Sequence, residues 1–172
     1  MIKNIELISL RCIIDEAKEV NTMKQTEIRD FLPEDEATYM RLSEEFYHSK
    51  AVLYPVPHEN FVATFTACMQ KSPFLRGLAI LQNGEMAGYA LLSFTWSNEV
   101  AGLVVLLEEA YIVPAFQGSG LGGELLQFVE EEYKSTAKRI RLEVTALNEG
   151  AVRLYERHGY KMFDYLQMVK EL

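Results

Sequence analysis

A glycine-rich stretch, PAFQGSGLGGELL at residues 114–126, has the residue types best suited to hold an anionic ligand. Gly118, Gly120 and Gly123 fit the spacing G-x-G-x-x-G, between an apolar run typical of a strand and a segment of helical periodicity. Glycine lets the backbone turn so that consecutive N–H groups point outward. The first turn of a helix adds unpaired N–H groups and the positive end of its dipole. The stretch therefore predicts a phosphate or diphosphate site that needs no lysine.

A dinucleotide-binding fold is one alternative for these glycines, since it uses the same spacing with an acidic residue about 20 residues later. Glu143 stands at that distance from Gly123. In that fold, however, the strand runs directly into the first glycine, whereas residues 114–117 intervene here. Residues 124–172 are also too few for its remaining strands. For these two reasons a nicotinamide or flavin oxidoreductase remains only as a weak alternative. The nucleotide P-loop is excluded separately, because no Gly-Lys-Ser/Thr follows the glycines.

Composition narrows the class of protein further. Apolar residues make up 49% of the 172 residues and charged residues 24%, which is typical of one globular domain. The net charge of −8 argues against a nucleic-acid partner and mildly favours a cationic one. Neither a disulfide framework nor a metal site is predicted. The two cysteines are far apart in the chain, and the three histidines are scattered: Cys12, Cys68, His48, His58 and His158.

No apolar run reaches membrane-spanning length, so no membrane partner is expected. The apolar N-terminal stretch is interrupted by Glu6 and Arg11 and lacks a basic start and a small-residue cleavage site. We therefore expect a cytoplasmic protein.

Periodicity and turn residues predict the order strand, helix, helix, three strands, helix, strand, helix, strand. Residues 1–22 are interpreted as an extension outside the core fold, and residues 23–172 as a single mixed α/β domain. Asn83-Gly84 predicts a two-residue hairpin, and the run at residues 102–113 predicts a central strand. Asn148 and Gly159 are suited to begin and end a helix, and residues 160–172 are expected to form one or two strands.

Two motifs at this separation resemble those of the GNAT superfamily of N-acetyltransferases. The stretch YIVPAFQGSGLGGELL is similar to the family's V-x-P-x-x-[QR]-G-x-G-x-[GA], with Ile112 at the valine position. NEGAVRLYERHGY, at residues 148–160, resembles N-x-x-A-x-x-L-Y-[EK]-x-x-G-[FY]. The resemblance implies a mixed, mostly antiparallel sheet flanked by helices, with a splayed parallel strand pair at the acetyl-CoA site. The extension at residues 1–22 has no counterpart in the pattern.

The resemblance also implies roles for individual residues. Coenzyme binding falls on Ile112, Val113, Gln117, Gly118, Ser119, Gly120, Leu121, Gly122, Gly123, Asn148 and Tyr155. Tyr155 has the place of the general acid, and backbone N–H groups near Ile112 and Val113 are candidates for stabilising the oxyanion. Glu108 and Glu109 are alternative general bases, expected on opposite faces of their strand.

Plain structural roles compete with these assignments. Tyr155 fits a core aromatic, Asn148 a simple helix cap, and either glutamate a solvated or paired charge. Tyr47 and Tyr89 receive no functional role.

The function implied is acetyl transfer from acetyl-CoA to a primary amine, with no metal. The alternative is a non-catalytic acyl-CoA-binding sensor or regulatory module. The acceptor expected is a small-molecule amine, and because members of this family are often dimers, a homodimer is also expected.

Overall fold

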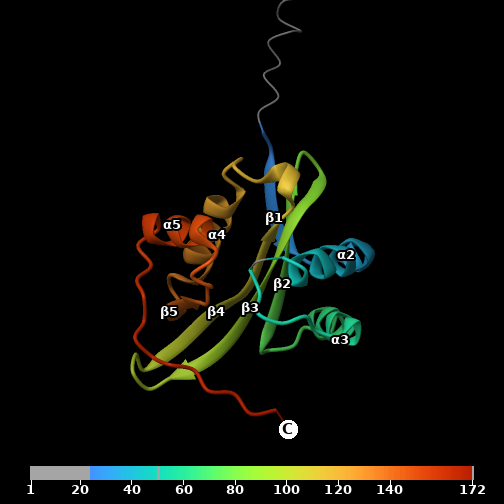
Figure 1. Cartoon of the computed structure of the whole chain (residues 1–172). Helices are drawn as coiled ribbons and strands as arrows, with labels where there is room; N and C mark the ends of the chain where they lie inside the picture. The colour runs from blue at the N-terminus through green and yellow to red at the C-terminus, as the bar shows by residue number, and fades with distance from the viewer. Residues whose placement is uncertain (1–23, 50, 172) are drawn as a thin grey trace, which may run out of the picture.

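The computed structural model describes residues 24–49 and 51–171, which share one five-stranded sheet (Figure 1). The expected extension at residues 1–22 lies outside the described residues. Strand order follows chain order, with antiparallel pairing from β1 to β4 and parallel pairing of β4 with β5. The strands are β1 (Thr26–Asp30), β2 (Leu75–Gln82), β3 (Glu85–Ser97), β4 (Gly102–Ile112) and β5 (Ala137–Leu142). The expected mixed, mostly antiparallel sheet is confirmed.

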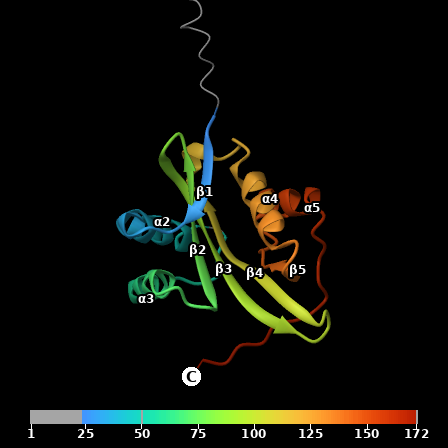
Figure 2. The ribbon, with the colours of Figure 1, turned by 180° about the vertical axis from the view of Figure 1, so that it is seen from behind.

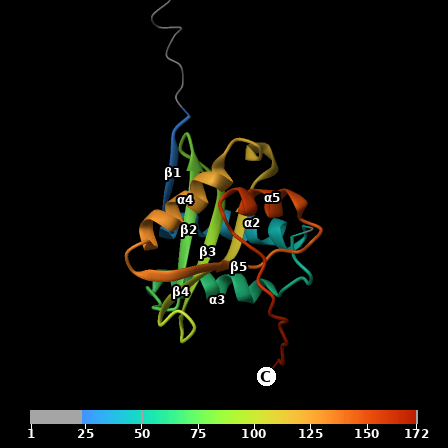
Figure 3. The ribbon, with the colours of Figure 1, turned by 90° about the vertical axis from the view of Figure 1, so that its left-hand side faces the viewer.

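Four α-helices of the described part cover the two faces of this sheet. They are α2 (Glu36–Tyr47), α3 (His58–Met69), α4 (Leu121–Tyr133) and α5 (Glu149–Arg157). Figures 1 and 2 show α2 and α3 on one side of the sheet and α4 and α5 on the other, and Figure 3 looks onto the second pair. Short 3-10 turns precede α2 and α4, at Pro33–Asp35 and Pro114–Phe116.

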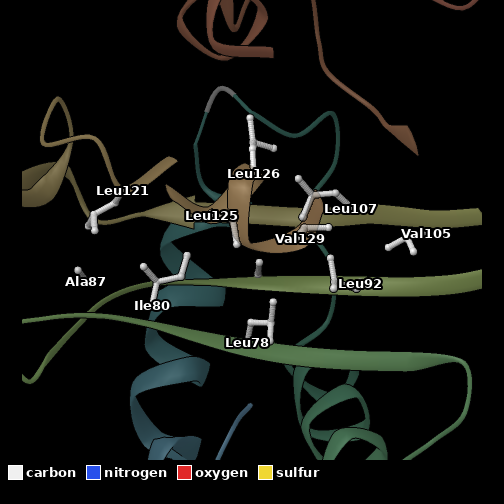
Figure 4. Packing of buried hydrophobic residues seen from close by; sticks show 11 residues of the cluster. Leu78, Ile80, Ala87, Leu92, Val105, Leu107, Leu121, Leu125, Leu126 and Val129 are labelled. Carbon is white, nitrogen blue, oxygen red and sulfur yellow. The ribbon is translucent and has the colours of Figure 1, made fainter. Parts of the chain in front are cut away.

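Each face of the sheet has its own buried cluster. On the α4 side, Leu121, Leu125 and Val129 point from the helix onto β2, β3 and β4 (Figure 4). Their spacing of four residues places them on one side of the helix, as the periodicity predicts. On the α2 and α3 side the core is aromatic, and Tyr39 and Tyr89 meet edge to face with ring centroids 5.2 Å apart. The sheet is therefore held between two cores and fixes the relative positions of the helices.

The predicted hairpin at Asn83-Gly84 is confirmed. Both residues have positive φ, 53° and 82°, which matches the two-residue turn that connects twisted antiparallel strands without splaying them.

A β-bulge in β4 contradicts the expected placement of Glu108 and Glu109 on opposite faces. Leu91 pairs with Glu109 and Leu92 pairs with Leu107, so Glu108 is the extra residue. The strict alternation of side chains holds only for a regular strand, and the bulge interrupts it. Both carboxylates therefore point toward the α2 and α3 face: Glu109 meets tyrosines of that face, and Glu108 accepts a hydrogen bond from Ser93 at 2.6 Å.

The prediction of one or two strands after α5 is wrong for the described residues 160–171, which contain no strand. Instead, Tyr165 donates a hydrogen bond to Glu99 at 2.8 Å, and Phe163 lies under the guanidinium of Arg139 at 5.2 Å. Leu166 and Met168 remain almost fully exposed. Alternation of apolar residues predicts which side chains would share one face of a strand. Whether the strand forms also depends on a neighbouring element that packs against those side chains.

None of the described helices has the length and apolar character needed to cross a membrane.

Candidate functional site

The parallel strands β4 and β5 separate before β4 ends, which opens the sheet at one edge. Their pairing stops at Leu107 and Leu142, while β4 continues to Ile112. The expected splayed strand pair is therefore present. A cavity of about 800 Å³ lies at this opening and extends from the glycine loop to the end of α2.

Backbone groups of β4 face the opening at alternate residues. The N–H of Val113 donates to the carbonyl of Ala87 at 2.9 Å, on the β3 side. The carbonyl of Ile112 points the other way and accepts a hydrogen bond from the Gln117 side chain at 2.9 Å. Because backbone groups alternate between the two neighbours of a strand, the N–H groups of Ala110 and Ile112 are directed to the open side. Val113 is therefore not an oxyanion donor, whereas Ala110 and Ile112 both direct an N–H group to the opening.

The glycine loop joins β4 to α4 in a conformation that suits glycine. Gly118 has a φ of 72° and Gly120 a φ of 97°, both in the left-handed region that other L-residues rarely adopt. The first helical bond runs from the N–H of Glu124 to the carbonyl of Gly120, so the N–H groups of residues 121–123 have no acceptor within the helix. No side chain of the described residues caps this helix. The start of α4 is thus open to an anion from the cavity.

Helix α5 forms the opposite wall of the cavity. Asn148 caps it, since its side-chain oxygen accepts a hydrogen bond from the N–H of Ala151 at 3.3 Å, as its sequence position predicts. Gly122 allows the close approach of α4 and α5, because a Cβ there would lie 2.9 Å from Leu154. Gly159 follows the helix with a φ of 83°, which confirms the predicted helix end.

Helix α5 brings two polar residues, Tyr155 and Arg157, to this wall. The side chain of Tyr155 lines the cavity and packs on the core beneath α4. Burial raises the pKa of Tyr155. Its hydroxyl has no hydrogen-bond partner among the described residues, so it is free to bind a ligand in the cavity.

Glu109 lies beside the cavity, on the aromatic face of the sheet. Its two carboxylate oxygens accept hydrogen bonds from Tyr47 at 2.7 Å and from Tyr89 at 2.6 Å. Burial raises the pKa of this carboxyl, and the neighbouring charge of Glu108 acts in the same direction. From the sequence alone, neither tyrosine receives a functional role. Their hydrogen bonds to Glu109 become visible only from the bulge in β4 and from the packing of α2 on the sheet.

Most of the predicted coenzyme-binding residues meet at the cavity. They are Ile112, Gln117, Gly118, Gly120, Leu121, Gly122, Gly123, Asn148 and Tyr155. Four predicted site residues lie outside its lining: Glu108, Glu109, Val113 and Ser119. Val113 packs instead against the aromatic core, and the hydroxyl of Ser119 donates to the carbonyl of Phe116.

Two other features of the described residues bear on the site. They contain no group of three or more His, Cys, Asp or Glu placed to hold a metal ion. A second cavity of about 770 Å³ lies between β5 and the C-terminal residues, and no residue of the glycine loop lines it.

Comparison with known proteins adds relatives of both sequence and fold. An uncharacterized N-acetyltransferase of Methanocaldococcus jannaschii is 31% identical over 96 residues, which cover 52% of this chain and 42% of that protein. Spermine/spermidine N(1)-acetyltransferase of Bacillus subtilis is 27% identical over 128 residues, covering 66% of this chain and 83% of that protein. Some of these alignments thus span only about half of the relative, 42% for the first and 54% for an uncharacterized N-acetyltransferase of Bacillus subtilis.

The fold is shared with solved structures. An aminoglycoside N-acetyltransferase in complex with CoA superposes with a TM-score of 0.72 at 15% identity, covering 88% of this chain and 98% of that one. The family model of the acetyltransferase (GNAT) family matches residues 29–160. Since that match includes both motifs and well over half of the sequence, the chain belongs to the GNAT family of acetyltransferases.

Proposed function

We propose that this chain is an N-acetyltransferase that transfers the acetyl group of acetyl-CoA to a primary amine. One observation carries the proposal: a single cavity is lined by the uncapped start of α4, the open edge of β4 and Tyr155. These three features supply an anion site, backbone hydrogen bonds and a hydrogen-bond donor for the leaving thiolate in one place.

The coenzyme binds across the opening between β4 and β5. Its diphosphate lies on the N–H groups of residues 118–123, where the helix dipole favours negative charge. Its pantetheine arm follows β4 and pairs with the outward N–H of Ile112 and the outward carbonyl of Ala110. Asn148 and Tyr155 contact the arm from α5.

The reaction is a direct attack of a neutral amine on the thioester. The amine nitrogen forms a bond to the carbonyl carbon, and the negative charge that develops on the carbonyl oxygen is stabilised by the N–H of Ala110, the outward donor farther from the diphosphate loop. Collapse of this adduct breaks the carbon–sulfur bond, and CoA leaves as the thiolate while the nitrogen keeps the acetyl group.

Tyr155 assists the departure of the thiolate by hydrogen bonding. An ordinary thiol has a pKa near ~8.5 and an ordinary tyrosine near ~10, and burial raises the pKa of Tyr155 above its usual value. Complete proton transfer to sulfur is therefore uphill. A hydrogen bond that strengthens as charge builds on sulfur stabilises the transition state without that transfer.

Glu109 is the better of the two candidate bases. Its carboxyl is largely shielded from water and has a raised pKa, so it accepts a proton more readily than an exposed glutamate. It lies outside the cavity lining, and the proton of the amine therefore reaches it through a bridging water. Glu108 is exposed, and its carboxylate accepts a hydrogen bond from Ser93.

The acceptor enters from the end of α2, where Phe46, Ser49, Ala51 and Tyr111 line the cavity. The C-terminal end of a helix favours cations, and the chain carries a net charge of −8. Together with the spermine/spermidine acetyltransferase among its relatives, this supports a small cationic amine as the acceptor.

An amine panel tests the proposal. Polyamines, amino acids, aminoglycosides and peptides are incubated with acetyl-CoA, and free CoA is measured with a thiol reagent. Turnover with at least one amine is expected. CoA binding without any turnover would favour the non-catalytic module, and no binding would reject both functions.

A further inference from the structure

A lysine and a glutamate meet directly above the glycine loop, although neither belongs to the motif. The ammonium group of Lys24 contacts the carbonyl of Ser119 and lies 4.0 Å from the carboxylate of Glu124. A Cβ built on Gly120 would be 3.9 Å from that ammonium and 3.7 Å from that carboxylate. Both charged groups therefore lie at the N-terminal end of α4, next to the loop residues that line the cavity, although neither group lines the cavity itself.

The backbone holds Lys24 in this place. The next residue, Gln25, donates its N–H to the Asn83 side chain at 3.1 Å and accepts the N–H of Asn83 at 2.8 Å. These bonds tie the start of β1 to the turn between β2 and β3, beside the start of α4. The position of the Lys24 ammonium beside the loop is therefore set by the hydrogen-bonded backbone of the next residue, Gln25.

The charge arrangement suits exchange of one anion for another. Glu124 lies in the first turn of α4, where its negative charge is favoured by the helix dipole and by Lys24. The pair is weak, since the two side chains are 36% and 43% exposed and water screens them. A diphosphate on the loop would approach both groups, attracting the ammonium and repelling the carboxylate.

We infer that Lys24 binds the diphosphate of the coenzyme, and that Glu124 competes with the diphosphate for Lys24 when the loop is free. This inference rests on the proposed function for the identity of the ligand. It assigns opposite roles to two neighbouring charges: the lysine raises coenzyme affinity and the glutamate lowers it.

Isothermal titration calorimetry with CoA tests both signs. Lys24→Met is expected to raise the Kd about tenfold, the size of one hydrogen bond to a charged group. Glu124→Gln is expected to lower it about threefold, the size of an exposed ion pair. Lys134→Met is the matched control, because it removes an exposed lysine paired with Glu131 at the far end of the same helix, and it should leave the Kd unchanged.

Dephospho-CoA, which keeps the diphosphate and lacks the 3′-phosphate, identifies the group that Lys24 contacts. The Lys24→Met effect should persist with this ligand, and its disappearance would overturn the assignment to the diphosphate. Normal CoA affinity in Lys24→Met, or weaker binding in Glu124→Gln, would overturn the inference while leaving the proposed function intact. Failure of the unaltered protein to bind CoA would instead reject the proposed function.

Discussion

Replacing Tyr155 with phenylalanine should reduce turnover without reducing stability. The substitution removes one hydroxyl and keeps the ring in the core beneath α4. Among the described residues that hydroxyl has no partner, so no buried group loses a hydrogen bond and the free energy of unfolding should stay within about 0.5 kcal/mol. In the transition state the lost bond is one to a developing thiolate, worth about 1.5–3 kcal/mol. At about 1.4 kcal/mol per factor of ten, kcat should fall roughly 10- to 150-fold.

The assay is steady-state acetylation of the best amine from the panel, combined with urea unfolding of both proteins. The KM for acetyl-CoA should change little, because the bond is made mainly in the transition state. Tyr160→Phe is the matched control: its ring centroid lies 6.0 Å from that of Tyr155, its hydroxyl is also buried without a partner among the described residues, and it does not line the cavity. A kcat of Tyr155→Phe within twofold of normal, or an equal loss in Tyr160→Phe, would refute the reasoning.

Three further predictions concern the loop, the base and the helix cap. Gly120→Ala should lower the free energy of unfolding by about 1–2 kcal/mol and weaken CoA binding, since residue 120 has a φ of 97°. Urea unfolding measures the first effect and calorimetry the second, and unchanged values would contradict the role of the loop. Burial raises the pKa of Glu109, so the folded protein holds this proton to higher pH than the unfolded chain does. The free energy of unfolding of the unaltered protein, compared with that of Glu109→Gln, should therefore fall as the pH rises above about 4.3 toward the raised pKa. Urea unfolding at several pH values checks this sign, and a relative gain would oppose it. Asn148→Ala should cost about 1 kcal/mol through loss of the cap and should also raise the KM for acetyl-CoA, whereas Asn148→Asp should restore stability.

The sequence predicts the fold well where local patterns decide it. Glycines at 118 and 120 require positive φ, and Asn83-Gly84 requires its turn, so the chain itself determines these conformations. The start and end of α5 are likewise encoded by Asn148 and Gly159.

The parts that the sequence does not predict depend on partners distant in the chain. The bulge at Glu108 arises from the pairing of β3 with β4, which no local pattern of β4 reveals. The role of Tyr47 as a donor to Glu109 depends on where α2 packs. The alternating apolar residues after α5 indicate strands, but side-chain contacts with Glu99 and Arg139 are formed instead.

The central claim is that the coenzyme binds along the glycine loop and the open edge of β4. Amide chemical shifts followed by NMR during a titration with CoA test it most directly. The account predicts the largest shifts at Gly118, Gly120 and residues 121–123, with smaller ones at Ala110 and Ile112. Shifts confined instead to β5 and residues 158–167, around the second cavity, would contradict it.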